Sequence, residues 1–138
     1  MMVQEIMSAP LRWVHPQENI AAAAGQMRRL GIGVLAVVEA ERIVGVVTDR
    51  DLTLALAGQD SALAGLAISR CMTARVICCR TRDTVEAAAA LMGDHQIRRL
   101  PVLDEAGRLA GLLSVSDIAV HASERLAGEA LGEIAEFR

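Results

Sequence analysis

The chain has 138 residues, and its 14 Lys+Arg and 17 Asp+Glu give a formal net charge of −3 at pH 7. Hydrophobic residues make up 53% but aromatic residues only 1%, so the chain can bury a core but lacks the basic surface and aromatic platforms of nucleic-acid binders. No apolar run approaches the roughly 18 residues of a membrane span, and the first residues lack the basic and apolar segments of a signal peptide.

The hydrophobic pattern of the first half predicts a strand, a helix, a pair of apolar strands and the opening of a second helix. These elements are expected at residues 11–15, 19–30, 34–38, 43–47 and from 48 onward. The unbroken apolar character of the paired strands indicates burial on both faces. The short polar turn between them predicts a hairpin.

The second half repeats the same order, which is the strongest signal in the sequence. Its elements are expected at residues 76–80, 83–95, 100–103, 109–113 and from 114 onward. Met7-Ser8-Ala9 aligns with Met72-Thr73-Ala74, and Gly45 aligns with Gly111. One residue is inserted in the second hairpin turn, where an extra residue costs least.

The predicted fold class is therefore α/β (α+β), with two β-α-β-β-α repeats packed as a pseudo-twofold module. Repeat 1 is expected at 7–58, a linker at 59–71, repeat 2 at 72–122 and a C-terminal helical tail at 123–138. Leu126, Ala130, Leu131 and Ile134 follow a helical spacing in the tail, which could dock on its own module or on a partner subunit.

The three cysteines predict neither a disulfide framework nor a metal site. Cys71, Cys78 and Cys79 are odd in number and are not spaced as zinc ligands. Buried thiols in a reducing cytoplasm are the simplest interpretation. A redox role for the adjacent pair is the alternative.

Both repeats keep a Ser or Thr followed three residues later by Asp where the last strand meets the last helix. Repeat 1 has Thr48 and Asp51, and repeat 2 has Ser114 and Asp117. A helix-capping box explains this spacing on structural grounds alone. The same groups could also form a nucleotide cradle, since a helix start favours phosphate and a carboxylate can bind both ribose hydroxyls.

The β-α-β-β-α repeat that closes with Gly-h-h-[Thr/Ser]-x-x-Asp, where h is hydrophobic, resembles a tandem pair of CBS (cystathionine-beta-synthase) domains, also called a Bateman module. The segment from Ile97 to Asp104 and the Met72-Thr73 pair are also similar to family motifs. The resemblance covers about residues 7–122, and bacterial stand-alone CBS proteins have this size.

The resemblance implies an adenosyl ligand such as AMP, ADP or ATP in clefts between the paired copies, with no obligatory cofactor. Asp51 and Asp117 would hold ribose hydroxyls, and Thr48 and Ser114 would lie beside the ribose or phosphate. The remaining implied positions flank the adenine or complete the cleft, and they are Val14, His15, Cys79, Arg80, Gly33, Val34, Arg98 and Arg99.

The two repeats differ in the charge that they offer to a phosphate. Repeat 2 has Arg98-Arg99 where repeat 1 has Gly33-Val34, and arginine is the side chain best suited to bind phosphate. Arg50 is a possible extra cation in repeat 1. We therefore predict one good nucleotide site per chain, the alternative being that Arg98 and Arg99 form a solvated pair or salt bridges.

These observations favour a regulatory nucleotide-binding module that signals to a partner protein. The alternative is an interaction or structural module without tight nucleotide binding. No catalytic triad, Gly-rich phosphate loop or metal-ligand cluster predicts an enzyme. We also expect a homodimer, because the apolar helices would otherwise leave hydrophobic patches exposed.

Overall fold

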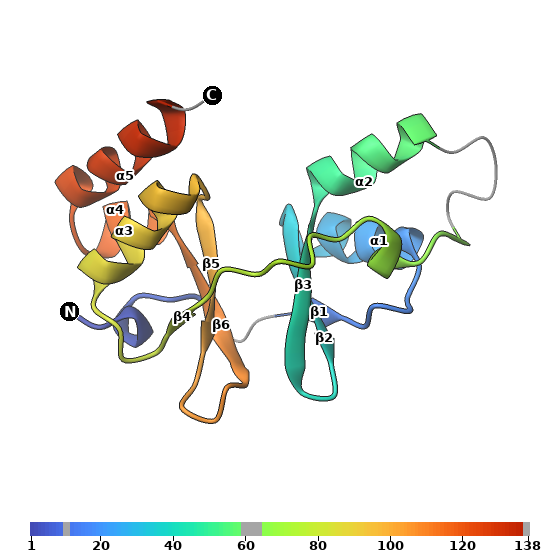
Figure 1. Ribbon diagram of the computed structural model, residues 1–138, viewed down its shortest axis with the longest axis horizontal. Coiled ribbons are helices and arrows are strands. Elements are labelled where there is room, and N and C mark those ends of the chain that lie inside the picture. The colour runs from blue at the N-terminus through green and yellow to red at the C-terminus, as the bar shows by residue number, and fades with distance from the viewer. Residues whose placement is uncertain (10–11, 59–64, 137–138) are drawn as a thin grey trace. The chain divides into compact units, whose positions relative to one another are not determined.

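The computed structural model describes residues 1–9, 12–58 and 65–136, and these residues form two compact units (Figure 1). Unit 2 comprises Arg12–Val76, and unit 1 joins Met1–Leu11 to Ile77–Arg138. The first residue expected in a strand, Leu11, lies outside the described residues, as do the linker residues 59–64 and the last two residues of the predicted tail.

The described part of unit 2 contains three strands and two α-helices in the predicted order. In chain order these are β1 (Trp13–Val14), α1 (Ile20–Leu30), β2 (Val34–Glu39), β3 (Arg42–Thr48) and α2 (Asp49–Ala55), followed by the 3₁₀ turns η2 (Leu56–Gly58) and η4 (Ile68–Arg70). The helix predicted from about Asn19 begins one residue later, because Asn19 is its cap and accepts a hydrogen bond from the Ala22 N–H.

Unit 1 repeats this order and adds one helix at each end. In chain order it has η1 (Val3–Glu5), β4 (Cys79–Arg80), α3 (Val85–His95), β5 (Arg99–Leu103), β6 (Leu109–Ser114), α4 (Val115–His121) and α5 (Glu124–Glu136). The mixed α/β class and the β-α-β-β-α order are confirmed in both units. The first strands are shorter than predicted, since only two residues of each have ladder partners.

Each unit has one three-stranded sheet, with the same registers in both. The short first strand is parallel to the middle strand, which is antiparallel to the last strand. Val37 pairs with Gly45 in one sheet and Val102 with Gly111 in the other, and the register of both hairpins shifts directly after that valine.

The hairpin turns differ, as the inserted residue predicts. In unit 2, Ala40 and Glu41 both have positive φ, of 51° and 65°, which is the backbone of a tight two-residue turn. In unit 1 the longer turn puts a glycine, Gly107, at φ 81°, and the Asp104 carboxylate accepts hydrogen bonds from the N–H groups of Ala106 and Arg108.

Each sheet is extended by the segment that opens the other repeat. Ser8 exchanges two backbone hydrogen bonds with Leu112 in unit 1, and Thr73 does the same with Val46 in unit 2. The segment that opens repeat 1 therefore packs with repeat 2, and the segment that opens repeat 2 packs with repeat 1. The units of packing are thus not the same as the units of sequence.

These close-packed segments explain the glycine of the Gly-h-h-[Thr/Ser] motif. A Cβ added at Gly45 would lie 2.6 Å from the Met72 sulfur, and one added at Gly111 would lie 2.8 Å from the Met7 sulfur and 2.7 Å from the Ser8 carbonyl oxygen. Such distances leave no room for a side chain. The motif glycine is therefore a packing requirement in both units.

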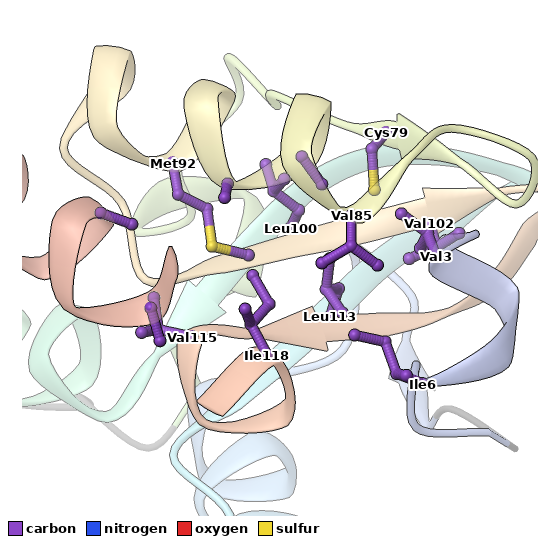
Figure 2. Close-up of a cluster of buried hydrophobic side chains, with 14 of the residues drawn as sticks. Val3, Ile6, Cys79, Val85, Met92, Leu100, Val102, Leu113, Val115 and Ile118 are labelled. Atoms are coloured by element: carbon purple, nitrogen blue, oxygen red, sulfur yellow. The ribbon is translucent and has the colours of Figure 1, made fainter. Parts of the chain in front are cut away.

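Unit 1 has the larger core because α5 closes it. Figure 2 shows Met92 of α3, Leu113 of β6 and Ile118 of α4 pointing into one buried cluster, which Val3 and Ile6 of the N-terminal segment also join. The buried face of α5, which is formed by Ala127, Ala130 and Ile134, belongs to the same cluster. The amphipathic tail therefore docks on its own unit, against α3 and α4.

Candidate functional site

The junction between β6 and α4 in unit 1 is built around a reciprocal capping box. The Ser114 hydroxyl accepts a hydrogen bond from the Asp117 N–H at 3.0 Å, and the Asp117 Oδ2 accepts one from the Ser114 N–H at 2.9 Å. This pair fixes the start of α4. It uses one carboxylate oxygen of a half-buried Asp117 and leaves the other, Oδ1, without a donor among the described residues.

The junction between β3 and α2 in unit 2 has the same geometry. The Thr48 hydroxyl accepts from the Asp51 N–H at 3.1 Å, and the Asp51 Oδ2 accepts from the Thr48 N–H at 2.9 Å. The capping interpretation of the motif is therefore confirmed at both junctions. A ligand is not needed to explain either aspartate, although each carboxylate retains an oxygen that could accept from a hydroxyl group.

A cavity of about 290 Å³ lies beside the Ser114 junction, close to the lower end of the range typical of ligand pockets, roughly 300–1,000 Å³. Its walls come from the start of β5, the end of β6, α4 and α5. The residues that line it are Arg98, Arg99, Ser114, Val115, Ser116, Ala119 and Leu131. The structure thus brings the predicted residues Arg98, Arg99 and Ser114 together, while the side chain of Asp117 is not part of this lining.

Arg98 and Arg99 are exposed and form none of the ion pairs found in the described part of the chain. The alternative of a solvated pair therefore fits the structure, and the salt bridges that it also allowed are not found among the described residues. Two guanidinium groups beside a hydroxyl group make the cavity cationic. It can accept a phosphate through charge-assisted, bidentate hydrogen bonds.

The corresponding place in unit 2 carries a negative charge instead. Gly33 stands where Arg98 stands, and Asp49 stands where Val115 stands. A Cβ added at Gly33 would lie 2.8 Å from the Asp49 Oδ2, so the carboxylate occupies the space next to this glycine. The backbone contact is the same in both units, since the Asp49 N–H donates to the Gly33 carbonyl at 2.9 Å and the Val115 N–H to the Arg98 carbonyl at 3.0 Å.

The residues predicted to flank an adenine lie on the short first strands or, for His15, directly after one. Val14 and Cys79 are both buried in the cores, so only their backbone groups could reach a ligand. The N–H groups of His15 and Arg80 already donate to the carboxylates of Glu18 and Asp83, at 2.7 and 2.8 Å. Of the remaining predicted residues in unit 2, Val34 is buried and Arg50 is exposed at the start of α2.

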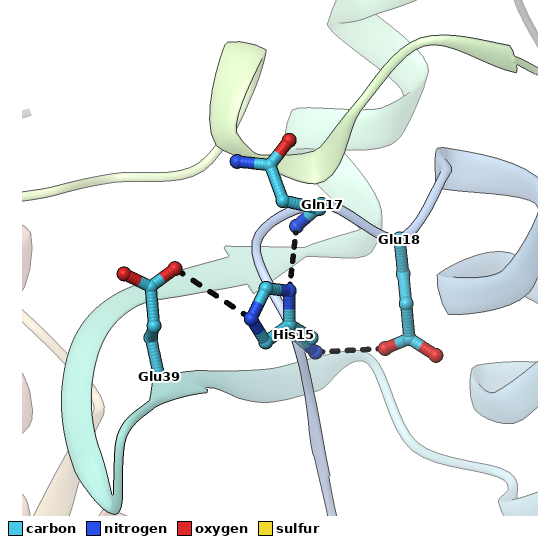
Figure 3. A network of polar contacts seen from close by, with 4 residues as sticks. All are labelled: His15, Gln17, Glu18 and Glu39. Carbon is cyan, nitrogen blue, oxygen red and sulfur yellow. Dashed lines mark hydrogen bonds and ion pairs between the residues drawn. The ribbon is translucent and has the colours of Figure 1, made fainter.

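The imidazole of His15 is held at the surface by two further contacts (Figure 3). Its Nδ1 accepts a hydrogen bond from the Gln17 N–H at 3.1 Å, and its Nε2 lies 3.6 Å from the Glu39 Oε2. The first contact places the proton of a neutral ring on Nε2, toward Glu39. The ring therefore has a structural role at the β1–α1 turn.

All three cysteines are free thiols. Burial raises the pKa of Cys79 to about 12, with further increases from the Asp83 carboxylate and from Cys78. Burial also raises the pKa of Cys71 and of Cys78, although Arg80 partly counteracts the rise at Cys78. A raised pKa keeps a thiol protonated, which disfavours a nucleophilic role.

Two contributions to the site were missed in the sequence. Asp49 stands inside the Thr48–Asp51 motif, and its alignment with Val115 was the available signal. Leu131 of α5 lines the cavity of unit 1, and nothing in the tail sequence indicated which of its apolar residues faces a cavity. No three His, Cys, Asp or Glu side chains in the described ranges are grouped as a metal site would require.

Comparisons with known proteins identify the family. The family model of the CBS domain matches the chain twice, at residues 3–58 and 68–124. The chain belongs to the CBS domain family. It is 33% identical over 133 residues to the CBS domain-containing protein YhcV of Bacillus subtilis, and the match covers 96% of this chain and 94% of YhcV.

Solved CBS-pair structures share the fold. The CBS domain pair of protein MJ0100, in complex with 5-methylthioadenosine and S-adenosyl-L-methionine, has a TM-score of 0.77 and 28% identity, covering 94% of this chain and 97% of that one. CBSX2 in complex with AMP has a TM-score of 0.77 and 27% identity, covering 90% and 97%. Some CBS pairs thus bind adenosyl ligands.

The comparisons also bear on catalysis. The relatives that carry enzyme names share with this chain only 21–24% of their own length, so the likeness is confined to their CBS segments. Stand-alone CBS proteins are generally regulatory modules without catalytic activity. No helix within the described ranges combines the length and the apolar character needed to cross a bilayer.

Proposed function

We propose that this CBS pair is a regulatory module that binds an adenine nucleotide in unit 1 and signals its presence to a partner protein. The observation that carries the proposal is the cavity of about 290 Å³ lined by Arg98, Arg99 and Ser114. It combines the right charge for a phosphate with a neighbouring carboxylate, Asp117, whose second oxygen can accept from a ribose hydroxyl. CBS-pair relatives that bind AMP support the adenosyl class.

Within this proposal, each predicted residue has a defined task. Arg98 and Arg99 bind the phosphate, Ser114 lies beside it, and Asp117 orients the ribose, while backbone groups of Cys79 and Arg80 flank the adenine. In unit 2, Thr48, Asp51 and Arg50 would serve the equivalent roles beside Gly33, Val34, Val14 and His15. No cofactor is required, and the free thiols suit a reducing compartment such as the cytoplasm.

Titration calorimetry with AMP tests the proposal most directly. Wild-type protein is expected to bind AMP, and Arg98→Ala/Arg99→Ala is expected to lose at least about tenfold in affinity, since each charge-assisted bond is worth roughly 1.5–3 kcal/mol. Arg28→Ala/Arg29→Ala, which removes two exposed arginines from the last turn of α1, is the matched control and is expected to bind normally. Equal affinities for both double variants would refute the phosphate site.

Asp117→Asn tests the ribose contact without removing the cap. The amide oxygen can still accept from the Ser114 N–H, so the unliganded protein should keep most of its stability. The thermal stabilisation by AMP, which follows mass action, is expected to fall. An unchanged stabilisation in this variant would remove Asp117 from the site and leave it as a capping residue only.

The helix α5 offers a route by which an occupied cavity could signal. Leu131 forms part of the cavity wall but is 40% exposed, so a bound nucleotide would cover it and favour the docked position of α5. Binding and docking are then linked, each stabilising the other. AMP is expected to slow hydrogen exchange along α5, and an unchanged exchange rate with AMP bound would contradict this route.

We also propose a homodimer, because both repeats keep an exposed apolar residue at the same position. Leu54 of α2 aligns with Val120 of α4, and their side chains are 57% and 74% exposed. No described residue of the chain covers them, so we assign the contact to a second copy. Light scattering is expected to give a dimer for wild type and for Leu131→Glu, but a monomer for Leu54→Glu/Val120→Glu; a wild-type monomer would refute the dimer.

An interaction module without nucleotide binding is the second candidate. It is favoured by the capping boxes, which account for Thr48, Asp51, Ser114 and Asp117 without a ligand. A screen of AMP, ATP, 5-methylthioadenosine and S-adenosyl-L-methionine that produces no thermal shift would select this function, provided that the dimer forms.

A further inference from the structure

We propose that Asp49 is a specificity-determining residue that restricts the junction of unit 2 to adenosyl ligands without a phosphate group. The proposal rests on the proposed function, because it assumes that the CBS pair binds adenosyl compounds. It names a different ligand class for each repeat of one chain.

The first step is the charge around the two junctions. Unit 1 has Arg98 and Arg99 before β5 and at its start, and Asp117 is the acidic residue in the first turn of α4. At the aligned positions unit 2 has Gly33 and Val34, and the first turn of α2 has Asp49, Arg50 and Asp51. These positions carry two arginines and one aspartate in unit 1, and one arginine and two aspartates in unit 2. The sign of their summed charge is therefore reversed.

The second step is the position of the Asp49 carboxylate. Its Oδ2 would be 2.8 Å from a Cβ at Gly33, and Gly33 aligns with Arg98. The carboxylate therefore occupies the space beside the residue that aligns with Arg98, the arginine proposed to bind phosphate in unit 1. Its Oδ1 accepts from the Arg50 N–H at 2.9 Å, which holds the group in place.

The third step concerns Arg50, a cation in the first turn of α2. It aligns with Ser116, which lines the cavity of unit 1. One arginine that stands between Asp49 and Asp51 in the sequence offers little net attraction to a phosphate carrying about −1.5 to −2 charges. A neutral thioether or a cationic sulfonium meets no such repulsion.

Two probes distinguish these ligand classes in a background that isolates unit 2. The background is Arg98→Ala/Arg99→Ala, which removes the phosphate site of unit 1, and the probes are AMP and 5-methylthioadenosine in titration calorimetry. In this background 5-methylthioadenosine is expected to bind at least about tenfold more tightly than AMP. Adding Asp49→Asn is expected to reduce that ratio to about threefold or less.

The control is Glu41→Gln in the same background. Glu41 is exposed in the β2–β3 turn, at the opposite end of β3 from Thr48, so it changes the net charge equally but leaves the junction intact. It is expected to leave the ratio unchanged. Raising the salt concentration from about 0.1 M to 1 M, which shortens the screening length from roughly 10 to 3 Å, should mimic Asp49→Asn.

The outcomes separate the two proposals. Wild type that binds neither probe refutes the proposed function. Wild type that binds AMP, with a background that binds neither probe, keeps the proposed function and overturns this inference. A background that binds both probes equally, or a ratio that does not respond to Asp49→Asn, also overturns it. Only the expected pattern, with Glu41→Gln unchanged, supports Asp49 as the selective residue.

Discussion

The two units of this chain share a backbone and differ in what surrounds it. Their sheets have the same registers, and the four hydrogen bonds of their capping boxes agree within 0.2 Å, at 2.9–3.1 Å. Unit 1 has the cationic cavity and the covering helix α5, whereas unit 2 has Asp49 at the equivalent junction. The repeated residues thus maintain the fold, and we propose that the residues that differ between the repeats set the ligand preference of each junction.

The largest expected effect comes from weakening the contact of α5 with the core of unit 1. Ile134 is buried against the core of unit 1, so Ile134→Ala is expected to lower the free energy of unfolding by about 2–3 kcal/mol. Urea denaturation measures the loss. Leu131→Ala on the same helix is the control, and because its side chain is 40% exposed its cost is expected to stay below about 1 kcal/mol. Equal losses would mean that α5 is not anchored through its buried face.

A second prediction uses Cys79, which stands where unit 2 has Val14. Burial raises the pKa of Cys79 from the ordinary thiol value of 9.0 to about 12. Between these values the unfolded chain has lost the thiol proton while the folded chain keeps it. The folded state therefore binds more protons, and the stability contributed by this thiol, fully present below pH 9, falls as the pH rises toward 12.

The expected slope is about 1.4 kcal/mol of unfolding free energy per pH unit at most. Cys79→Val, which copies unit 2, is expected to remove most of that slope in denaturation curves recorded between pH 9 and 11. The chain suits this measurement because it contains no tyrosine and all 14 of its basic residues are arginines. An identical slope in wild type and variant would show that Cys79 ionises without a folding penalty.

The repeat made most of the fold predictable from the sequence. Element order, both hairpins and the helix starts at Thr48 and Ser114 followed from periodicity and capping signals, because these features depend on residues close in the chain. The inserted residue in the second turn also followed from alignment. The capping boxes were predicted as one of two interpretations, and the structure confirms their hydrogen bonds.

The packing of each repeat's opening segment against the other repeat could not be predicted in the same way. Met7 and Met72 occupy equivalent positions in the alignment, and each contacts a motif glycine, but the alignment does not say which one. The structure pairs Met7 with Gly111 and Met72 with Gly45. The residues that line the cavity could not be predicted from the local sequence pattern either, because Leu131 reaches the cavity only through the packing of α5.

A third prediction tests whether the capping hydroxyl groups of Thr48 and Ser114 contribute equally to stability. Thr48→Ala and Ser114→Ala each remove one hydroxyl acceptor from a helix N-terminus, so each is expected to cost about 1 kcal/mol in the unliganded protein. Urea denaturation measures both. Affinity for AMP should respond mainly to Ser114→Ala, because Ser114 lines the cavity. Stability losses that differ by more than about 1 kcal/mol would show that the caps are not equivalent.

The smallest expected effect concerns the hairpin turns, where repeat 2 has one more residue than repeat 1. Ala40 and Glu41 adopt positive φ without a glycine, which costs an ordinary residue roughly 1–2 kcal/mol. Ala40→Asn/Glu41→Gly supplies the residues that this turn prefers and, after the extra entropy of glycine in the unfolded chain, is expected to stabilise the protein by about 0.5 kcal/mol. Gly107→Ala in unit 1 is the counterpart, and its φ of 81° predicts a loss of about 1 kcal/mol. Thermal denaturation of both variants measures these changes in stability. If Ala40→Asn/Glu41→Gly lowers the stability, the strain at Ala40 and Glu41 is already relieved by contacts that glycine cannot make.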